Sequence, residues 1–164
     1  LREERDIHFL LSGWGMGFAR LKDMQAAAQL ANVTLVDRVA DSELDALLSS
    51  ADAWLIPYRK DVAGVSVPSR FYNLLAAGRP VILVSEPEAE AALTVSENGL
   101  GWVVTPGRPD QLADAVRLAS RSQDTGMAER AVATARSFSP ERALASYAAL
   151  VAELLSDRDV ERTA

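Results

Sequence analysis

Four basic side chains are the best candidates for binding a charged ligand, because the chain as a whole is acidic. Its formal net charge is −6 over 164 residues. Arg38, Arg59 and Lys60 each follow a predicted strand, where they could bind an anion or be solvated surface charges. Arg70 lies in the first turn of a predicted helix, where the positive end of the backbone dipole disfavours a cation. An anion bound at that helix N-terminus would remove the conflict, so Arg70 is the strongest candidate.

The stretch of residues 61–84 positions Arg70 between a polar loop and a buried strand. Residues 67–69 are typical of a helix start, and Gly78 followed by Pro80 is typical of a helix end. The all-apolar run 81–84 is typical of a strand buried on both faces. The apolar side chains of the helix share one face by their spacing, and they are Phe71, Leu74 and Leu75. The loop and the helix N-terminus therefore predict a single anion-binding unit.

Short apolar runs that alternate with helical patterns extend along the whole chain. The predicted strands are 7–12, 33–36, 53–56, 81–84 and 101–105. This alternation predicts an α/β domain, a Rossmann-like three-layer α/β/α fold with a parallel sheet of about five strands. We expect the domain to cover residues 1–156 and a polar tail to follow at 157–164.

The helices are predicted from their caps and from the spacing of their apolar residues. The first helix follows the first strand and is expected to end at about residue 31. The others are expected to begin at Asp41, at residue 69, at the capping-box pair Ser85 and Glu88, at Pro109 and at residue 139, and one more is expected to cover residues 124–136. In the last helix the apolar side chains are expected to face inward. They are Leu144, Tyr147, Ala148, Val151, Leu154 and Leu155.

Ligands of such sheets bind beyond the carboxyl ends of the strands, which nominates the loops 13–17, 37–39, 59–66 and 105–108. Gly13 and Gly15 fit the start of a dinucleotide-binding motif, but Phe18 replaces its last small residue. Asp37 lies near the right distance along the chain to hold a ribose, so an NAD-binding domain is one alternative. The glycines could also ease a strand-to-helix turn or let the backbone approach another ligand.

The composition excludes several other classes. The chain contains no cysteine, which excludes disulfides and thiolate metal sites. His8, the only histidine, lies away from the predicted ligand edge, so neither a metal site nor a Ser/His/Asp set is expected. The acidic balance argues against a general nucleic-acid binder. No apolar run approaches the ~18 residues of a membrane span. A cytoplasmic protein is expected, with association at the inner face of the membrane a further expectation.

Several motifs lie along the chain in an order that resembles a known enzyme family. The most specific is Pro68-Ser-Arg70 followed by Ala76-Ala-Gly-Arg-Pro-Val-Ile82, and others are Leu10-Leu-Ser-Gly-Trp-Gly15, Val33-Thr-Leu-Val-Asp-Arg-Val39 and Ala51-Asp-Ala-Trp-Leu-Ile-Pro57. Together they resemble the C-terminal, nucleotide-sugar-binding domain of a retaining family-four (group 1) glycosyltransferase, which has the two-domain GT-B fold. The resemblance covers nearly the whole chain, and its subgroup includes enzymes that transfer N-acetylated sugars during surface-polysaccharide assembly.

The resemblance implies that this edge of the sheet binds a nucleotide diphosphate sugar, with a UDP-sugar the expected donor. The base would lie against the main chain of residues 38 and 39. The loop 64–67 and the helix N-terminus at residues 69 and 70 would cradle the diphosphate. The expected donor-binding residues are Gly13, Gly15, Arg38, Val39, Val65, Ser66, Val67, Ser69, Arg70 and Asn73.

The chain departs from the family at a pair of glutamates. Val65 stands where the resemblance implies a carboxylate that contacts the donor sugar, and Asn73 stands where it implies one that holds the ribose hydroxyls. An amide can still donate to and accept from a diol, so ribose binding by Asn73 is retained in the prediction. A non-catalytic nucleotide-sugar-binding or regulatory domain of the same fold is therefore the main alternative to an enzyme.

The resemblance also implies parts that the sequence lacks. The family's domain begins with a further strand and helix, and the loop between them normally carries basic residues for the diphosphate. The acceptor site belongs to the N-terminal domain, so no catalytic residue is assigned and the isolated chain is expected to be inactive. No essential cofactor or metal is expected. The expected partners are the N-terminal domain of the same protein, the nucleotide sugar, and a glycan or lipid-linked acceptor, with no nucleic acid.

Overall fold

The computed structural model describes residues 1–58, 60 and 69–161, and the side chains of these residues except 69 and 156–161. Five strands of four residues each alternate with helices, and every paired strand is parallel to its neighbour. The strands are β1 Phe9–Ser12, β2 Val33–Val36, β3 Trp54–Pro57, β4 Val81–Val84 and β5 Gly101–Val104. The predicted α/β fold with about five parallel strands is thus confirmed.

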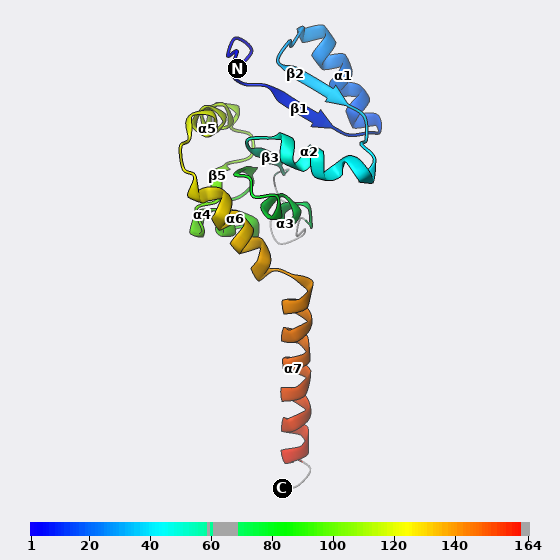
Figure 1. Ribbon diagram of the computed structural model, residues 1–164, viewed down its shortest axis with the longest axis vertical. Coiled ribbons are helices and arrows are strands. Elements are labelled where there is room, and N and C mark those ends of the chain that lie inside the picture. The colour runs from blue at the N-terminus through cyan, green and yellow to red at the C-terminus, as the bar shows by residue number, and fades with distance from the viewer. Residues whose placement is uncertain (59, 61–68, 162–164) are drawn as a thin grey trace.

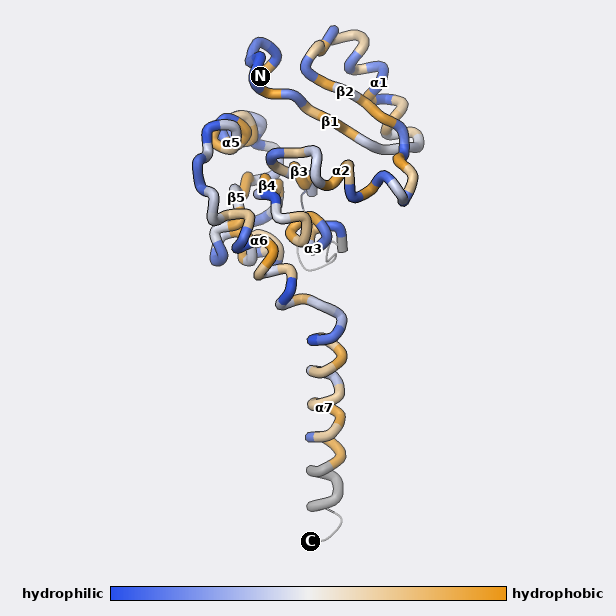
Figure 2. Tube along the Cα trace, in the orientation of Figure 1, coloured by the Kyte–Doolittle hydropathy of each residue, from blue (hydrophilic) through white to orange (hydrophobic). Residues whose placement is uncertain are grey.

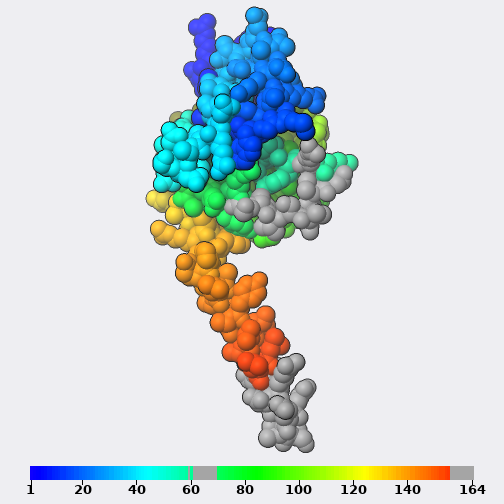
Figure 3. All heavy atoms as spheres, turned by 90° about the vertical axis from the view of Figure 1, so that its right-hand side faces the viewer, coloured from blue at the N-terminus to red at the C-terminus, as the bar shows by residue number. Residues whose placement is uncertain are grey.

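The strands form two hydrogen-bonded groups. One sheet has the order β1-β2 and the other the order β3-β4-β5. Figure 1 shows the first pair with α1 at one end of the molecule and the second sheet below it, among α3, α4 and α6. Figure 3 shows the same stacking from the side, with the blue and cyan N-terminal elements over the green middle of the chain.

Seven α-helices and one short 3-10 helix connect and follow the strands in the described part of the chain. They are α1 Met16–Ala28, η1 Asp41–Glu43, α2 Leu44–Ser50, α3 Ser69–Ala76, α4 Glu90–Glu97, α5 Pro109–Arg121, α6 Gly126–Ser137 and α7 Pro140–Glu161. The helix α7 includes residues 157–161, which belong to the expected polar tail 157–164.

The central strand β4 separates two apolar clusters, because successive side chains of a strand point to opposite faces. Val81 and Leu83 are fully buried in a cluster with Phe71 and Leu75 of α3, to which α4 and α6 also contribute. Ile82 packs into a second cluster formed with α5 and the N-terminal segment. The sheet β3-β4-β5 is therefore covered on both faces, as expected for the middle layer of a three-layer domain.

Two expectations about helices are wrong. The helix α4 begins at Glu90 after the N-cap Ala89, and neither Ser85 nor Glu88 caps it. The apolar side chains of α7 do not face inward: Leu144 and Tyr147 are each 69% exposed, and Val151, Leu154 and Leu155 are also exposed. Figures 1 and 2 show α7 extending away from the rest of the molecule with apolar residues along it. Over the described residues, no helix has the length and apolar character that crossing a membrane requires.

Candidate functional site

The loop after β1 turns tightly because two glycines make room for the chain. The N–H of Gly13 donates to the carbonyl oxygen of Val36 at 3.1 Å, which extends the pairing of β1 with β2. A Cβ at Gly13 would come within 3.1 Å of the Phe18 ring, which is buried. Gly15 has a φ of +89° at the N-cap of α1. Gly13 thus leaves room for the Phe18 ring, and Gly15 allows the positive φ of the turn. These packing and backbone needs explain both glycines even if no ligand binds there.

The end of β2 lies against this loop. The guanidinium carbon of Arg38 lies over the ring of Trp14, 5.1 Å from its centroid, and a nitrogen of Arg38 lies 3.9 Å from an Asp41 carboxylate oxygen. Val39 is half-buried beside it. Gly13, Gly15, Arg38 and Val39 therefore lie in one neighbourhood. The Trp14 ring is 70% exposed and offers an apolar surface next to a cation.

The acidic residue of this neighbourhood is already paired. The Lys22 Nζ lies 2.8 Å from Asp37 Oδ1. In the NAD alternative, Asp37 would bind a ribose, and Lys22 would have to be displaced or shared. With Phe18 filling the space beside Gly13, this pairing weighs against a dinucleotide site.

The second neighbourhood is the N-terminal half of α3. Phe71, Leu74 and Leu75 are at most 5% exposed, so one face of the helix is fixed in the core. Arg70 and Asn73, three residues apart, are both exposed on the other side. Among the described residues, no carboxylate forms an ion pair with Arg70. A cation and an amide on one exposed face are suited to bind a phosphate and a hydroxyl group.

Two tyrosines lie near Arg70: Tyr72 belongs to α3 itself, and Tyr58 follows β3. Burial raises the pKa of the Tyr58 hydroxyl, an effect that the nearby Arg70 charge partly offsets. This hydroxyl is enclosed and has no hydrogen-bond partner among the described residues. The Tyr72 hydroxyl donates to Glu90 Oε1 at 3.2 Å. Burial and the Glu90 carboxylate raise the pKa of Tyr72 to about 12. Both phenols thus remain protonated at neutral pH.

Part of the predicted site lies outside the described residues. These positions are Arg59, Val65, Ser66 and Val67, together with the side chain of Ser69. No hydrogen bond, ion pair or ring contact among the described residues joins the Trp14–Arg38 neighbourhood to the Tyr58–Arg70 neighbourhood. The binding role of these residues and the juxtaposition of the two neighbourhoods stay predictions.

Three other residues considered in the sequence analysis or lying in the nominated loops show no feature of a binding site. The His8 Nε2 lies 2.8 Å from Thr34 Oγ1 across the β1-β2 pair, which fits its expected structural role. Arg108, in the loop after β5, is paired with Asp110 at 2.7 Å. Lys60 is exposed. In the described part of the chain, no group of three or more His, Asp or Glu side chains could hold a metal ion.

Sequence reasoning missed Trp14 and Tyr58. Each is the second residue after a predicted strand: Trp14 lies between two glycines and Tyr58 follows Pro57. An aromatic residue at the carboxyl end of a parallel strand is the signal that could have nominated both.

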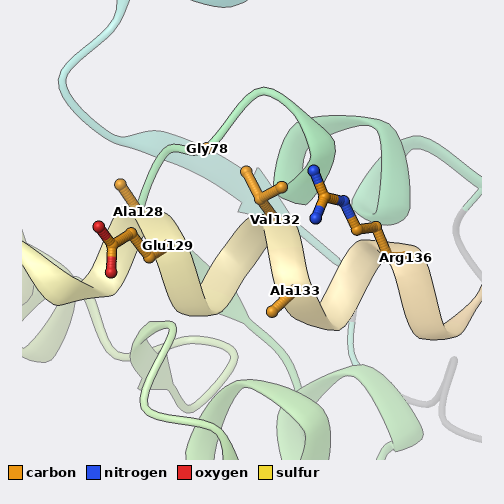
Figure 4. Close-up of a pocket in the computed structure, with 6 residues that line it drawn as sticks. All are labelled: Gly78, Ala128, Glu129, Val132, Ala133 and Arg136. Atoms are coloured by element: carbon orange, nitrogen blue, oxygen red, sulfur yellow. The ribbon is translucent and has the colours of Figure 1, made fainter.

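A surface hollow of ≈ 380 Å³ lies elsewhere, between α6 and the turn that precedes β4 (Figure 4). It is at the amino end of β4, whereas ligands of parallel sheets bind beyond the carboxyl ends. The hollow is therefore separate from the candidate site. Its lining residues are Gly78, Ala128, Glu129, Val132, Ala133 and Arg136.

The chain has a parallel α/β architecture of the type whose ligands bind beyond the carboxyl ends of the strands. Residues 1–121 match the family described as "Glycosyl transferases group 1", and the chain belongs to this family. It is 32% identical over 85 residues to the "Probable glycosyltransferase WbjE" of Pseudomonas aeruginosa, a match over 52% of this chain. It is 30% identical over 120 residues, or 73% of this chain, to the "Putative colanic acid biosynthesis glycosyl transferase WcaI" of Escherichia coli K12.

Solved structures have the same fold. The pneumococcal O-GlcNAc transferase GtfA, in complex with UDP and GlcNAc, superposes on 90% of this chain with a TM-score of 0.65 at 19% identity. AviGT4, a glycosyltransferase involved in avilamycin A biosynthesis, superposes on 89% with a TM-score of 0.58 at 22% identity. The chain covers 29% and 43% of those two structures. It spans 21% and 29% of the two curated relatives. The family and the GT-B type of fold are thus established for this chain, which corresponds to a part of each relative.

Proposed function

We propose that this chain is the donor-binding domain of a retaining glycosyltransferase and that it binds a nucleotide diphosphate sugar, most favourably a UDP-sugar. The observation that carries the proposal is Arg70, an exposed cation in the first turn of α3 with no carboxylate partner among the described residues. A helix N-terminus and a guanidinium together favour a diphosphate. The complex of GtfA with UDP supports the choice of nucleotide.

The proposed chemistry needs no residue of this chain to form a bond with the sugar. When the bond between sugar and diphosphate breaks, negative charge develops on the leaving group. Arg70 and the N-terminal N–H groups of α3 would stabilise that charge best in a cleft from which water is excluded. Asn73, one turn further along the exposed face, would bind the ribose diol, and Trp14 with Arg38 would lie beside the base.

The rest of the enzyme is part of the proposal. An N-terminal domain of the same polypeptide would close the cleft and bind a glycan or lipid-linked acceptor on the cytoplasmic side of the membrane. The transferred group would be a hexosyl or N-acetylhexosaminyl unit, and no essential metal or other cofactor would take part. The relative named for colanic acid biosynthesis supports a role in polysaccharide assembly.

Titration with uridine diphosphate, followed by NMR, tests the site. We expect the backbone signals of Arg38, Arg70 and Asn73 to shift, with weak affinity in the isolated chain. Arg70→Gln should weaken binding about tenfold, which corresponds to roughly 1.4 kcal/mol for one charge-assisted contact. The matched control is Arg121→Gln, which removes an exposed arginine from the last turn of α5. Shifts that cluster around Trp102 instead, or equal losses in both variants, would show that the site is elsewhere.

A non-catalytic binding domain is the second candidate, and the residues Val65 and Asn73 favour it because neither is a carboxylate. The full-length protein should then bind UDP-sugars without transferring or hydrolysing them. Turnover of a UDP-sugar by that protein, measured as release of UDP, would exclude this candidate.

A further inference from the structure

Tyr72 lies on one flank of α3, between the buried face of the helix and the exposed face that carries Arg70 and Asn73. At 3.6 residues per turn, it is about 100° around the helix from each of its neighbours in sequence, Phe71 and Asn73. Its ring is half-buried and meets the fully buried Phe71 ring edge-on, with the centroids 5.2 Å apart. The helix is thus held from the core by Phe71 and from one flank by Tyr72.

Two other helices hold the Tyr72 side chain. Its hydroxyl donates to Oε1 of Glu90, the first residue of α4, at 3.2 Å. Its ring centroid lies 4.5 Å from that of Phe138, at an interplanar angle of 37°. Phe138 is the C-cap of α6, which packs beside α3. One side chain of α3 therefore receives a polar contact from α4 and an apolar contact from the end of α6.

The place of Tyr72 within α3 matters because the start of a helix is its least constrained part. The first four N–H groups of a helix have no partner within it, and helix ends fray. Tyr72 belongs to the first turn of α3, as does Arg70. Burial and the Glu90 carboxylate raise the pKa of Tyr72 to about 12, so its hydroxyl keeps the donated proton at neutral pH. Both contacts thus constrain the turn under ordinary conditions.

We propose that Tyr72 is a positioning residue for nucleotide binding. Glu90 and Phe138 hold its side chain, and the turn of α3 that carries Arg70 is thereby kept in the orientation that a diphosphate requires. A group that is already ordered binds more tightly, because less conformational freedom is lost when the ligand arrives. The role of Tyr72 rests on the proposed function, since it requires that the exposed face of α3 binds the nucleotide.

The contact with Phe138 extends this role to the joint between α6 and α7. Ser139, next in sequence, donates its N–H to the carbonyl oxygen of Arg136 at 3.3 Å, and its own carbonyl oxygen accepts from the N–H of Ala143 in α7 at 3.1 Å. Figure 1 shows α7 leaving the rest of the molecule from this joint. A change at the joint should therefore alter the affinity for the nucleotide through Tyr72.

Binding of uridine diphosphate to the 164-residue chain, measured by calorimetry at a temperature where each variant is folded, tests this role. Tyr72→Phe keeps the ring and removes the hydroxyl, and it should weaken binding about threefold, within the range of one net hydrogen bond. Phe138→Ala should weaken binding by a similar factor. The matched controls are Tyr147→Phe and Leu118→Ala, which change exposed side chains of α7 and α5 and should leave the affinity unchanged.

Variants of Glu90 separate positioning from packing. Glu90→Gln retains an acceptor oxygen and should bind uridine diphosphate nearly as well as the native chain does, whereas Glu90→Ala should match Tyr72→Phe. Because both of the latter remove the same hydrogen bond, the double variant should lose no more affinity than either single variant. In the absence of ligand, the backbone NMR signals of Arg70 and Asn73 should shift in these same variants.

Two results would overturn the positioning role. One is a lower denaturation midpoint in Tyr72→Phe and Phe138→Ala with unchanged affinity, because Tyr72 would then act by packing alone. The other is an additive loss of affinity in the double variant. Arg70→Gln, measured in parallel, separates this role from the proposed function. A loss in Arg70→Gln without one in Tyr72→Phe would overturn the positioning role alone, whereas unchanged affinity in Arg70→Gln would overturn the site itself.

Discussion

Gly101 is the glycine at which an added carbon atom meets the most severe obstruction. It begins β5 with a φ of +150°, and a Cβ there would lie 1.9 Å from the carbonyl oxygen of Val81. That oxygen belongs to the adjacent strand β4, so it cannot move without breaking the sheet. Gly101→Ala should therefore lower the free energy of unfolding by about 3 kcal/mol or more, measured by urea denaturation.

The control for this substitution is Gly17→Ala in α1. No atom lies within 4 Å of a Cβ at Gly17, and the residue is helical. Alanine should leave the stability unchanged or raise it by up to about 1 kcal/mol, because glycine weakens a helix interior. A similar loss in both variants would mean that the contact with Val81 is not the cause.

Individual site residues could be predicted from the sequence where a residue type is unfavourable for its position in a helix or strand. Arg70 was nominated because a cation at a helix N-terminus is unfavourable, and the structure leaves it exposed without a carboxylate partner among the described residues. The contact of Arg38 with Trp14 joins residues from two separate loops. It could not be predicted because nothing in the local sequence around either residue encodes it.

At the scale of elements, the stability that Asp110 contributes at the start of α5 should depend on pH. The Asp110 carboxylate accepts hydrogen bonds from Arg108, and this pairing lowers its pKa from 3.8 to about 2. A carboxyl group whose pKa is lower in the folded state stabilises the fold above its unfolded pKa and loses that effect as the pH falls. The contribution of Asp110 should thus be complete above pH 4 and lost between about pH 4 and pH 2.

Comparison of the native chain with Asp110→Asn tests this coupling. The variant should be less stable near neutral pH, and the difference should shrink as the pH falls from 4 to 2. Arg108→Gln is the matched change, because it should return the Asp110 pKa toward 3.8, as read from the carboxyl carbon by NMR. A difference in stability that does not change with pH would show that Asp110 acts only through the helix geometry.

The strands were predictable as elements, whereas one helix start was not. Apolar runs between turn residues mark all five strands to within two residues of their observed ends. The capping-box pattern at Ser85 and Glu88 gave the wrong start for α4. Ser85 is buried, and its N–H donates to the carbonyl oxygen of Val104 at 3.0 Å. It still belongs to the sheet, and this pairing across strands is invisible in a local pattern.

At the scale of the whole molecule, the class of fold followed from alternation alone, but the division of the sheet did not. The pairing of β3 with β4 and β5, and of β1 with β2, depends on contacts between residues distant in sequence. The inward orientation expected for α7 failed for a related reason. Apolar spacing identifies the face of a helix that could be buried, but it does not say what covers that face.

The last helix should therefore contribute little to the stability of the rest of the chain. Every side chain described over residues 140–155 is exposed, and the apolar ones remain so. A chain that ends after Ser139 should lose the circular-dichroism signal of the 22 residues of α7. Its free energy of unfolding, measured at low protein concentration, should stay within about 0.5 kcal/mol of the 164-residue chain.

A core substitution shows how large the loss in free energy of unfolding would be if α7 packed against the core. Leu75 of α3 is fully buried, so Leu75→Ala should cost about 2–5 kcal/mol. A loss of that size on removing α7 would show that the helix packs onto the domain in solution. An unchanged stability, with α7 still helical in the longer chain, would leave its apolar face available to the rest of a longer polypeptide. Protection of Leu144 and Val151 from hydrogen exchange in that polypeptide, but not in the 164-residue chain, would then identify it as the partner of this face.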